Sequence, residues 1–161
     1  MAGTGLTNVI FTSGGTEANN LALAGTAWRR RVVSAVEHDS VLAAAPDATT
    51  VAVDRDGVID VAALEAALAA DPAPALVSIM LANNETGALQ PVKKIVGMVQ
   101  SHAIPVHTDA VQAIGKIAID FHDLGVSSLS LGAHKFHGPK GIGALIVHRD
   151  CPLSAILQGG H

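Results

Sequence analysis

The sequence predicts an α/β fold with a mostly parallel sheet. Short apolar runs alternate along the chain with segments of helical periodicity, a pattern typical of parallel strands connected by helices. Hydrophobic residues make up 49% of the 161-residue chain, and a mean hydropathy of +0.40 suits strands that are buried on both faces. Only 2% of the residues are aromatic, so small aliphatic side chains are expected to form the core. We therefore expect one three-layer domain around a seven-stranded sheet.

Each predicted element follows from its local pattern. The candidate strands are short apolar runs bounded by turn residues, and they span residues 9–12, 32–36, 50–53, 75–82, 104–108, 127–131 and 143–147. The candidate helices combine helical periodicity with a high content of Ala and Leu, and they span residues 17–30, 39–45, 61–70 and 92–102. In such sheets ligands bind beyond the carboxyl ends of the strands, so the residues that follow each strand are the candidate site residues.

Charge and hydropathy exclude several classes of function. The net charge is −4, and basic residues are scattered apart from residues 29–31, which is unlike a nucleic-acid-binding surface. No apolar run reaches the roughly 18 residues of a membrane span, and residues 1–5 lack the pattern of a secretory signal. We therefore expect a cytoplasmic protein without nucleic-acid or membrane partners. The single cysteine, Cys151, has no partner at the spacing of a zinc site and is expected to be a free thiol.

A glycine turn between a predicted strand and a predicted helix is the first candidate site. Residues 11–19 read Phe-Thr-Ser-Gly-Gly-Thr-Glu-Ala-Asn. A glycine turn that opens a helix offers unpaired backbone N–H groups and the positive end of the helix dipole, and both favour a bound phosphate. The alternative is an ordinary strand-to-helix turn that is capped by Thr16.

An acidic residue at the end of a predicted strand is the second candidate. Asp109 follows the apolar residues 104–108 directly, and a buried carboxylate costs several kcal/mol unless a cation or hydrogen-bond donors meet it. A protonated pyridine nitrogen is one such cation, and this pairing would keep the ring charged as an electron sink. The alternative is that Asp109 caps the helix that follows.

A lysine in a glycine-rich turn is the third candidate. Lys135 follows the predicted strand 127–131 and precedes several glycines. A lysine held there can be desolvated, which lowers its pKa and frees the neutral amine to react with an aldehyde. Two lesser candidates, residues 36–38 and 82–87, also place polar groups just after a strand, and each alone is more typical of a capped turn.

Together these segments resemble one enzyme family. SGGTEANN, EH, NNETG, HTDAVQ and AHKFHGPKGIG occur in this order and at similar separations in the cofactor domain of cysteine desulfurases, in the class V aminotransferase group. The resemblance covers nearly the whole chain and implies the large domain of fold type I pyridoxal-phosphate enzymes. It also implies pyridoxal 5'-phosphate as the cofactor. The implied reaction converts L-cysteine to L-alanine and passes the sulfur to a protein thiol, for iron–sulfur cluster assembly or another sulfur-transfer pathway.

The resemblance gives each matching residue a role. Lys135 would bind the cofactor aldehyde and move protons at the substrate carbon, and His38 would stack on the pyridine ring as the second catalytic residue. The other cofactor-binding positions would be Gly15, Thr16, Asn84, Asp109, Gln112, Gly132 and His134. Among them, Asp109 would pair with the pyridine nitrogen and Gln112 with the phenolic oxygen, while the phosphate would lie at the glycine turn and beside His134.

The sequence also departs from the family pattern. Family members are more than twice as long, so residues 1–161 are expected to form part of a large domain without the N-terminal segment and the C-terminal small domain. Cys151 follows Lys135 by only 16 positions and matches no catalytic cysteine of the family. Gly132 replaces a serine that binds the phosphate in many relatives, which would weaken the hold on the cofactor. By resemblance, we expect a homodimer and a separate protein that accepts the sulfur.

Two other interpretations remain open at this level. The chain could belong to another class V transaminase or lyase, because the motifs specify the cofactor better than the substrate. It could also be a non-catalytic remnant of a cofactor domain. A metal site is not expected, because His134 and His137 flank a glycine loop and do not share one helix face.

Overall fold

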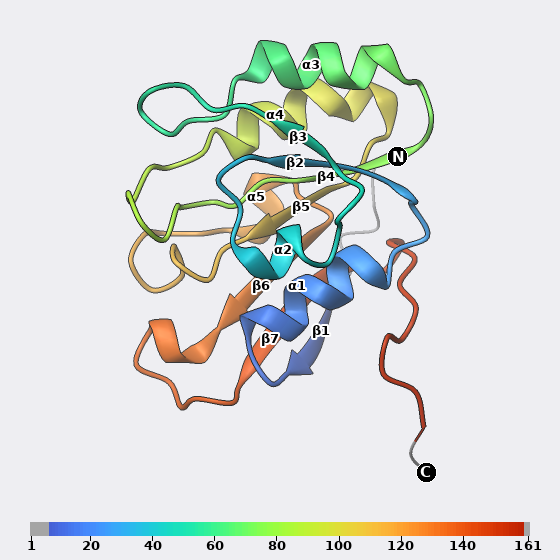
Figure 1. Cartoon of the computed structure of the whole chain (residues 1–161). Coiled ribbons are helices and arrows are strands. Elements are labelled where there is room, and N and C mark those ends of the chain that lie inside the picture. Colours follow the sequence, from blue (N-terminus) through green and yellow to red (C-terminus); the bar gives the residue numbers. More distant parts are fainter. Residues whose placement is uncertain (1–6, 160–161) are drawn as a thin grey trace.

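A seven-stranded sheet forms the middle layer of the computed structural model, which describes residues 7–159 (Figure 1). The strands lie in the order β1-β7-β6-β5-β4-β2-β3. All neighbouring pairs are parallel except those of β7, which runs antiparallel to both β1 and β6. The predicted α/β fold with a mostly parallel sheet is therefore confirmed. The bounds are β1 Thr7–Thr12, β2 Arg30–Ser34, β3 Thr49–Val51, β4 Ala75–Ser78, β5 Val106–Asp109, β6 Ser128–Gly132 and β7 Gly143–His148.

Helices cover both faces of the sheet and complete the three layers. The helices are α1 Gly15–Ala24, α2 Asp39–Leu42, α3 Val61–Ala70, α4 Val92–Val99 and α5 Phe121–Leu124, with short 3-10 helices η1 Gln100–His102 and η2 Ala133–Lys135. In Figure 1, α3 and α4 lie together above the sheet, and α1 and α2 lie on its other side. No helix within residues 7–159 is long and apolar enough to cross a membrane.

Alternation along the strands divides the core into two clusters. In β2, Val32 packs in the cluster with Leu64 of α3 and Ile95 of α4, whereas Val33 packs in the cluster with Leu23 of α1. Successive residues of a strand point to opposite faces, so a continuous apolar run supplies both clusters at once. This explains why β2 and β4 carry apolar residues at successive positions.

Several boundaries differ from those predicted. The helix predicted for residues 17–30 ends at Ala24, because the guanidinium groups of Arg30 and Arg31 donate to the carbonyls of Ala67 and Leu23 and this segment pairs with β4. The helix predicted for residues 39–45 ends at Leu42. The strand predicted for residues 75–82 ends at Ser78.

The chain beyond β4 remains bonded to β5 although it is no longer a regular strand. Ile79 N–H donates to the carbonyl of His107 at 3.1 Å, and Leu81 N–H donates to that of Asp109 at 2.8 Å. Helix α5 was not predicted. Its N-cap Asp120 accepts hydrogen bonds from the backbone of His122 and Asp123 at 2.8 and 3.1 Å, and the helix ends at Gly125 with φ of 71°.

The topology brings the candidate residues to one side of the sheet. Strands β1, β2, β4, β5 and β6 run in the same direction, so the segments that follow them leave from the same edge. In Figure 1 these segments form the row of loops on the left. The glycine turn, Asp109 and Lys135 therefore meet at this edge.

The buried face of α3 gives a test of the core. Leu64 is fully buried between α3 and the sheet, so Leu64→Ala should lower the free energy of unfolding by roughly 2–5 kcal/mol. The exposed neighbour Glu65 provides the control, since Glu65→Ala should change stability by no more than about 0.5 kcal/mol. Urea unfolding followed by circular dichroism measures both, and equal effects of the two substitutions would contradict this packing.

Candidate active site

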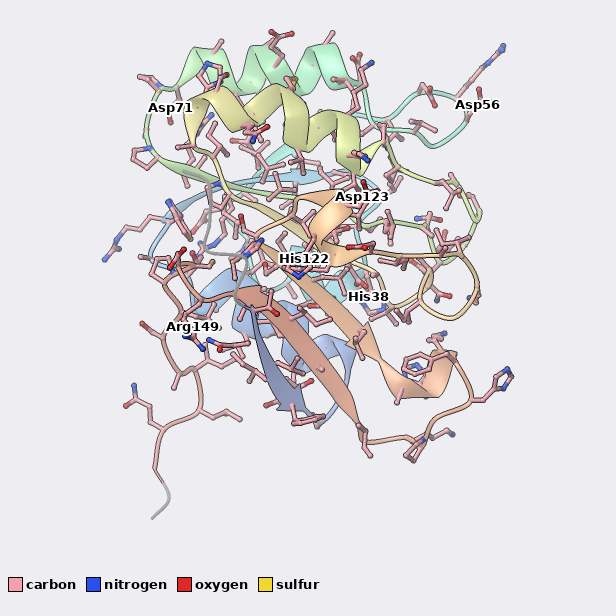
Figure 2. The ribbon with its side chains drawn as sticks, turned by 180° about the vertical axis from the view of Figure 1, so that it is seen from behind. His38, Asp56, Asp71, His122, Asp123 and Arg149 are labelled. Atoms are coloured by element: carbon pink, nitrogen blue, oxygen red, sulfur yellow. The ribbon has the colours of Figure 1, made fainter. Side chains whose placement is uncertain are left out.

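A cavity of about 570 Å³ lies beyond the carboxyl ends of the strands. Seen from behind in Figure 2, His38 lies on the same side of the molecule as the turn after η2, whereas Asp71 and Arg149 lie on the other side. The cavity is lined by all but one of the residues that the sequence singled out, namely Gly15, Thr16, His38, Asn84, Asp109, Gln112, His134 and Lys135. These residues come from five separate segments of the chain, so the fold alone brings them together.

The glycine turn leaves the start of α1 free to bind a ligand. The N-cap is Gly14, which has no side-chain cap, so Thr16 does not cap this helix as the alternative interpretation required. The carboxylate of Glu17 reaches back and accepts hydrogen bonds from Ser13 N–H at 2.7 Å and from its hydroxyl at 2.6 Å. These bonds lower the pKa of Glu17 and fix the turn. The remaining N–H groups of the first turn suit an anion.

The backbone of this turn packs closely against neighbouring parts of the site. A Cβ atom on Gly15 would lie 2.5 Å from Cγ2 of Val111, in the turn that follows Asp109. Gly132 does not line the cavity but borders the same turn, since a Cβ atom there would lie 3.3 Å from the backbone nitrogen of Gly15. The fold therefore leaves only a narrow space for a side chain at position 132.

Asp109 ends β5 with only 5% of its surface exposed. One carboxylate oxygen accepts a hydrogen bond from Val111 N–H at 2.8 Å, and the other accepts one from Nδ2 of Asn19 at 2.7 Å. Burial raises the pKa of Asp109, although these two bonds and the nearby His38 oppose the rise. The residues after Asp109 form turns and no helix, so this carboxylate does not cap a helix.

His38 is held at the start of α2. Its Nδ1 accepts a hydrogen bond from Ser40 N–H at 3.1 Å and lies 2.8 Å from the Ser40 hydroxyl oxygen. Because Nδ1 is the acceptor, the neutral ring carries its proton on Nε2. The sequence contains this signal, since a His-Asp-Ser segment can cap a helix, but the tautomer follows only from the geometry.

Lys135 lies in η2, directly after β6, and its neighbourhood is more open than the sequence suggested. Both His134 and Lys135 are exposed within the described chain, so residues 7–159 do not supply the expected desolvation of Lys135. The turn that follows is tightly constrained, with His137 in the left-handed region at φ of 68°. A second amine, that of Lys140, also lines the cavity.

The two amide residues reach the cavity in different ways. Asn83 is buried and braces its loop by accepting hydrogen bonds from the backbone of Glu85 and Thr86, both at 2.9 Å, so that the exposed Asn84 lines the cavity. Gln112 is half-buried, and its side-chain oxygen accepts a hydrogen bond from the amine of Lys116 at 3.0 Å. A ligand that needs the Gln112 side chain would compete with this surface contact.

Three residues of this neighbourhood received no role from the sequence. Asn19 and Ser40 line the cavity and bond to Asp109 and His38. Glu37 is buried behind it, where one oxygen accepts a hydrogen bond from Met80 N–H at 2.7 Å and the other has no partner within residues 7–159. Burial raises the pKa of Glu37 well above its ordinary value, so this carboxyl releases its proton at higher pH than an exposed glutamate does. No group of three His, Cys, Asp or Glu side chains in the described chain could hold a metal ion.

Comparison with known proteins decides the family. Residues 3–161 match the sequence profile described as aminotransferase class-V. The chain belongs to this family. A cysteine desulfurase of Sinorhizobium fredii is 46% identical over 95% of the chain, and the cysteine desulfurase IscS of Dictyoglomus turgidum is 40% identical over 94%. The predicted resemblance to cysteine desulfurases is confirmed, and this family of enzymes depends on pyridoxal phosphate.

Solved structures of the family share the fold. A NifS-like protein from Rickettsia africae superposes with a TM-score of 0.90 at 33% identity and covers 96% of this chain. A structure described as SspA in complex with cysteine superposes with a TM-score of 0.85 at 34% identity and covers 94%. The chain spans 42% and 41% of the two desulfurases above, and 44% and 48% of the two solved chains. It therefore corresponds to less than half of each relative.

The contact between Gly15 and Val111 gives a first test of the site. Gly15→Ala should push the Val111 turn away and lower the free energy of unfolding by roughly 1–3 kcal/mol, as expected for overpacking. Gly97 of α4 has open space around its Cα, so Gly97→Ala should instead stabilise the chain by roughly 0.8–1 kcal/mol. Urea unfolding distinguishes the two signs, and a stabilising effect of Gly15→Ala would show that the turn is not packed in this way.

The burial of Glu37 predicts a pH-dependent stability. Above its ordinary pKa of 4.5 the unfolded chain releases this proton while the folded chain keeps it, so raising the pH favours unfolding. The contribution of protonated Glu37 is therefore complete below pH 4.5 and is lost as the pH rises towards the folded-state pKa. Glu37→Gln can still accept from Met80 N–H but does not titrate.

The measurement is the free energy of unfolding in urea at a series of pH values. We expect the stability of Glu37→Gln relative to the unsubstituted chain to increase steadily as the pH rises above 4.5. Glu65→Gln, at an exposed position of α3, should run parallel to the unsubstituted chain throughout. Parallel curves for Glu37→Gln as well would mean that Glu37 is not buried as described.

Proposed function

We propose that this chain is the cofactor-binding part of a cysteine desulfurase, which uses pyridoxal phosphate to convert L-cysteine to L-alanine and passes the sulfur to a protein thiol. The observation that carries the proposal is the convergence of Lys135, His38 and the buried Asp109 on one cavity at the open start of α1. Relatives called cysteine desulfurase at 46% and 40% identity support this substrate over those of other class V enzymes.

The residues present fit the cofactor in charge and in polarity. The uncapped first turn of α1 would hold the phosphate, with Gly15, Thr16 and His134 around it. Asp109 would meet the ring nitrogen, because it is a buried carboxylate with room for a cation at the cavity. His38 would stack on the ring, and Asn84 and Gln112 would hydrogen-bond its polar edge. When bound, pyridoxal phosphate supplies an electron sink for the bond that breaks at the α-carbon of the amino acid.

Asp109 contributes by its charge. A buried carboxylate is costly without a cation, and pairing with a positive ring nitrogen removes that cost. An opposite charge within about 4–6 Å typically shifts a pKa by about 1–3 units, or roughly 1.4–4 kcal/mol. The same burial that raises the pKa of Asp109 would therefore strengthen its attraction for the protonated ring.

Lys135 contributes by its amine. It would bind the cofactor aldehyde covalently and would then carry a proton to and from the α-carbon of the substrate. Its exposure in the isolated chain leaves it accessible to an aldehyde. By analogy with the desulfurase family, we propose that this open side is covered in a homodimer, which would supply the desolvation that residues 7–159 do not.

Cys151 does not suit the role of sulfur acceptor. It is half-buried against the α1 side of the sheet, and burial raises its pKa, whereas a thiol needs to be a thiolate to attack sulfur. It is also absent from the cavity lining. We therefore propose that the accepting thiol belongs to a part of the enzyme outside this chain or to a separate acceptor protein.

The role of Lys135 is tested by the absorbance of the chain after incubation with pyridoxal phosphate and dialysis. We expect a visible band that borohydride abolishes, and we expect Lys135→Ala to lose that band completely. Lys140→Ala is the matched control, because it removes the other amine of the cavity and should keep the band. A band that survives Lys135→Ala and disappears in Lys140→Ala would overturn the assignment.

The same preparation distinguishes the alternative functions. With an added small thiol such as dithiothreitol to take up the sulfur as a persulfide and then reduce it to sulfide, a chain that binds the cofactor and forms alanine from cysteine, but does not react with other amino acids, fits the desulfurase. Reaction with another amino acid in preference to cysteine would favour a different class V transaminase or lyase. A folded chain that shows no band at all would favour a non-catalytic remnant.

A further inference from the structure

A row of polar side chains lies buried beneath α1, where the core is otherwise apolar. Ser78 of β4, His107 of β5 and Ser128 of β6 are direct neighbours across the sheet. Ser130 lies two positions further along β6, on the same face. Each of them is at most 4% exposed. Buried polar groups need hydrogen-bond partners, and the side chain that α1 offers to this row is Asn19, which is 1% exposed.

The orientation of the Asn19 amide is fixed by Asp109. An ionised carboxylate can only accept hydrogen bonds, so Asn19 must direct Nδ2 towards it, at 2.7 Å from Oδ2. The second hydrogen of Nδ2 goes to the hydroxyl oxygen of Ser40 at 2.8 Å. The amide oxygen is left to face Nε2 of His107 at 3.3 Å. Every polar atom of this amide therefore has a partner.

His107 holds the amide in that orientation from behind. Its burial lowers its pKa to about 3, so the ring is neutral. To donate to the amide oxygen of Asn19, the ring must carry its proton on Nε2, and Nδ1 is then the acceptor for the Ser128 hydroxyl at 2.9 Å. Turning the amide around would place its oxygen against the carboxylate of Asp109 and its hydrogens against the proton of His107.

The other end of the network reaches His38. Because Ser40 accepts from Asn19, its own hydroxyl hydrogen is available for Nδ1 of His38, at 2.8 Å. One amide thus bonds directly to Asp109 and, through Ser40, to His38. In the proposed function, Asp109 meets the nitrogen of one aromatic ring and His38 stacks on the face of the same ring.

We propose that Asn19 is a positioning residue that fixes Asp109 and His38 relative to each other, so that both meet the same heteroaromatic ring. The inference rests on the proposed function for the identity of that ring as pyridoxal phosphate. The adjacent Asn20 does not share the role, because its amide donates to the backbone carbonyls of Thr16 at 2.8 Å and Ser40 at 3.1 Å. It therefore provides a control one position away on the same helix.

The first test needs no substitution and no cofactor. Ring nitrogen chemical shifts of His107 in the intact chain, measured by NMR near neutral pH, should report a neutral ring with its proton on Nε2. A proton on Nδ1 would leave Nε2 to accept from the Ser130 hydroxyl, 3.5 Å away, or from a reversed amide. In either case His107 would not hold the Asn19 amide by donating to its oxygen, which would overturn the inference whether or not the chain binds pyridoxal phosphate.

The second test follows Asp109 itself. The titratable groups around this carboxylate are Glu37, whose pKa burial raises, His38, which favours the charged form, and neutral His107. Glu17, Lys135 and Lys140 also line the cavity. Asn19→Ala removes a donor to the charged form, so the carboxyl carbon of Asp109 should titrate at higher pH in the ligand-free variant. Asn20→Ala should leave this titration unchanged. Equal titrations in the two variants would contradict the proposal.

The third measurement connects the network to the cofactor. Asn19→Ala should retain pyridoxal phosphate roughly 10- to 100-fold less tightly, the range expected for one hydrogen bond to a charged group, and Asn20→Ala should match the unsubstituted chain. If Asn19→Ala does not fold, Ser40→Ala removes the hydroxyl that connects Asn19 to His38 but leaves the bond from Asn19 to Asp109 in place, and it should still weaken retention. Unchanged retention in both variants would overturn the inference alone, whereas an unsubstituted chain that retains no cofactor would overturn the proposed function and leave the two NMR tests in force.

Discussion

Asp109 is a carboxylate with 5% of its surface exposed, and the arrangement of this edge of the sheet depends on satisfying it. Its two oxygens accept from the turn that follows β5 and from α1, so the one side chain ties a strand end, a loop and a helix together. The network continues to Ser40 and the start of α2. A buried carboxylate without a cation lowers the stability of the fold, and a cation that binds beside it removes this cost. Binding sites commonly contain groups of this kind.

Most of the fold could be predicted because burial on both faces leaves a strong signal. Strands such as β2 and β4 supply both core clusters at once and therefore carry apolar residues at successive positions. The errors arose where distant contacts decide the outcome. The helix stops at Ala24 because Gly25 caps it against the backbone of Ser154, and because Arg30 and Arg31 lie in a strand that pairs with β4. The four-residue helix α5 is too short to show a helical period, and only its Asp120 cap and Gly125 stop could have indicated it.

The candidate site was predictable to the extent that residues follow strands. Parallel strands deliver their carboxyl ends to one edge, so their positions in the sequence were enough to predict that Asp109 and Lys135 meet. The supporting residues could not be found in this way, because an asparagine inside a helix gives no sign of the side chain it will bond to ninety positions later. The exposure of Lys135 could not be predicted either, because it depends on which parts of the molecule cover the turn after β6.

The pairing of β1 with β7 has a consequence for the order in which the chain assembles. Thr7 lies opposite His148, and β1 has no other neighbour among the strands of residues 7–159, so β1 cannot pair until β7 has been synthesised. Phe11 of this strand remains 81% exposed even in the finished sheet. Contacts of such long range are slow to form, and the edge of the sheet beside the glycine turn is therefore completed only after nearly the whole described chain has been made.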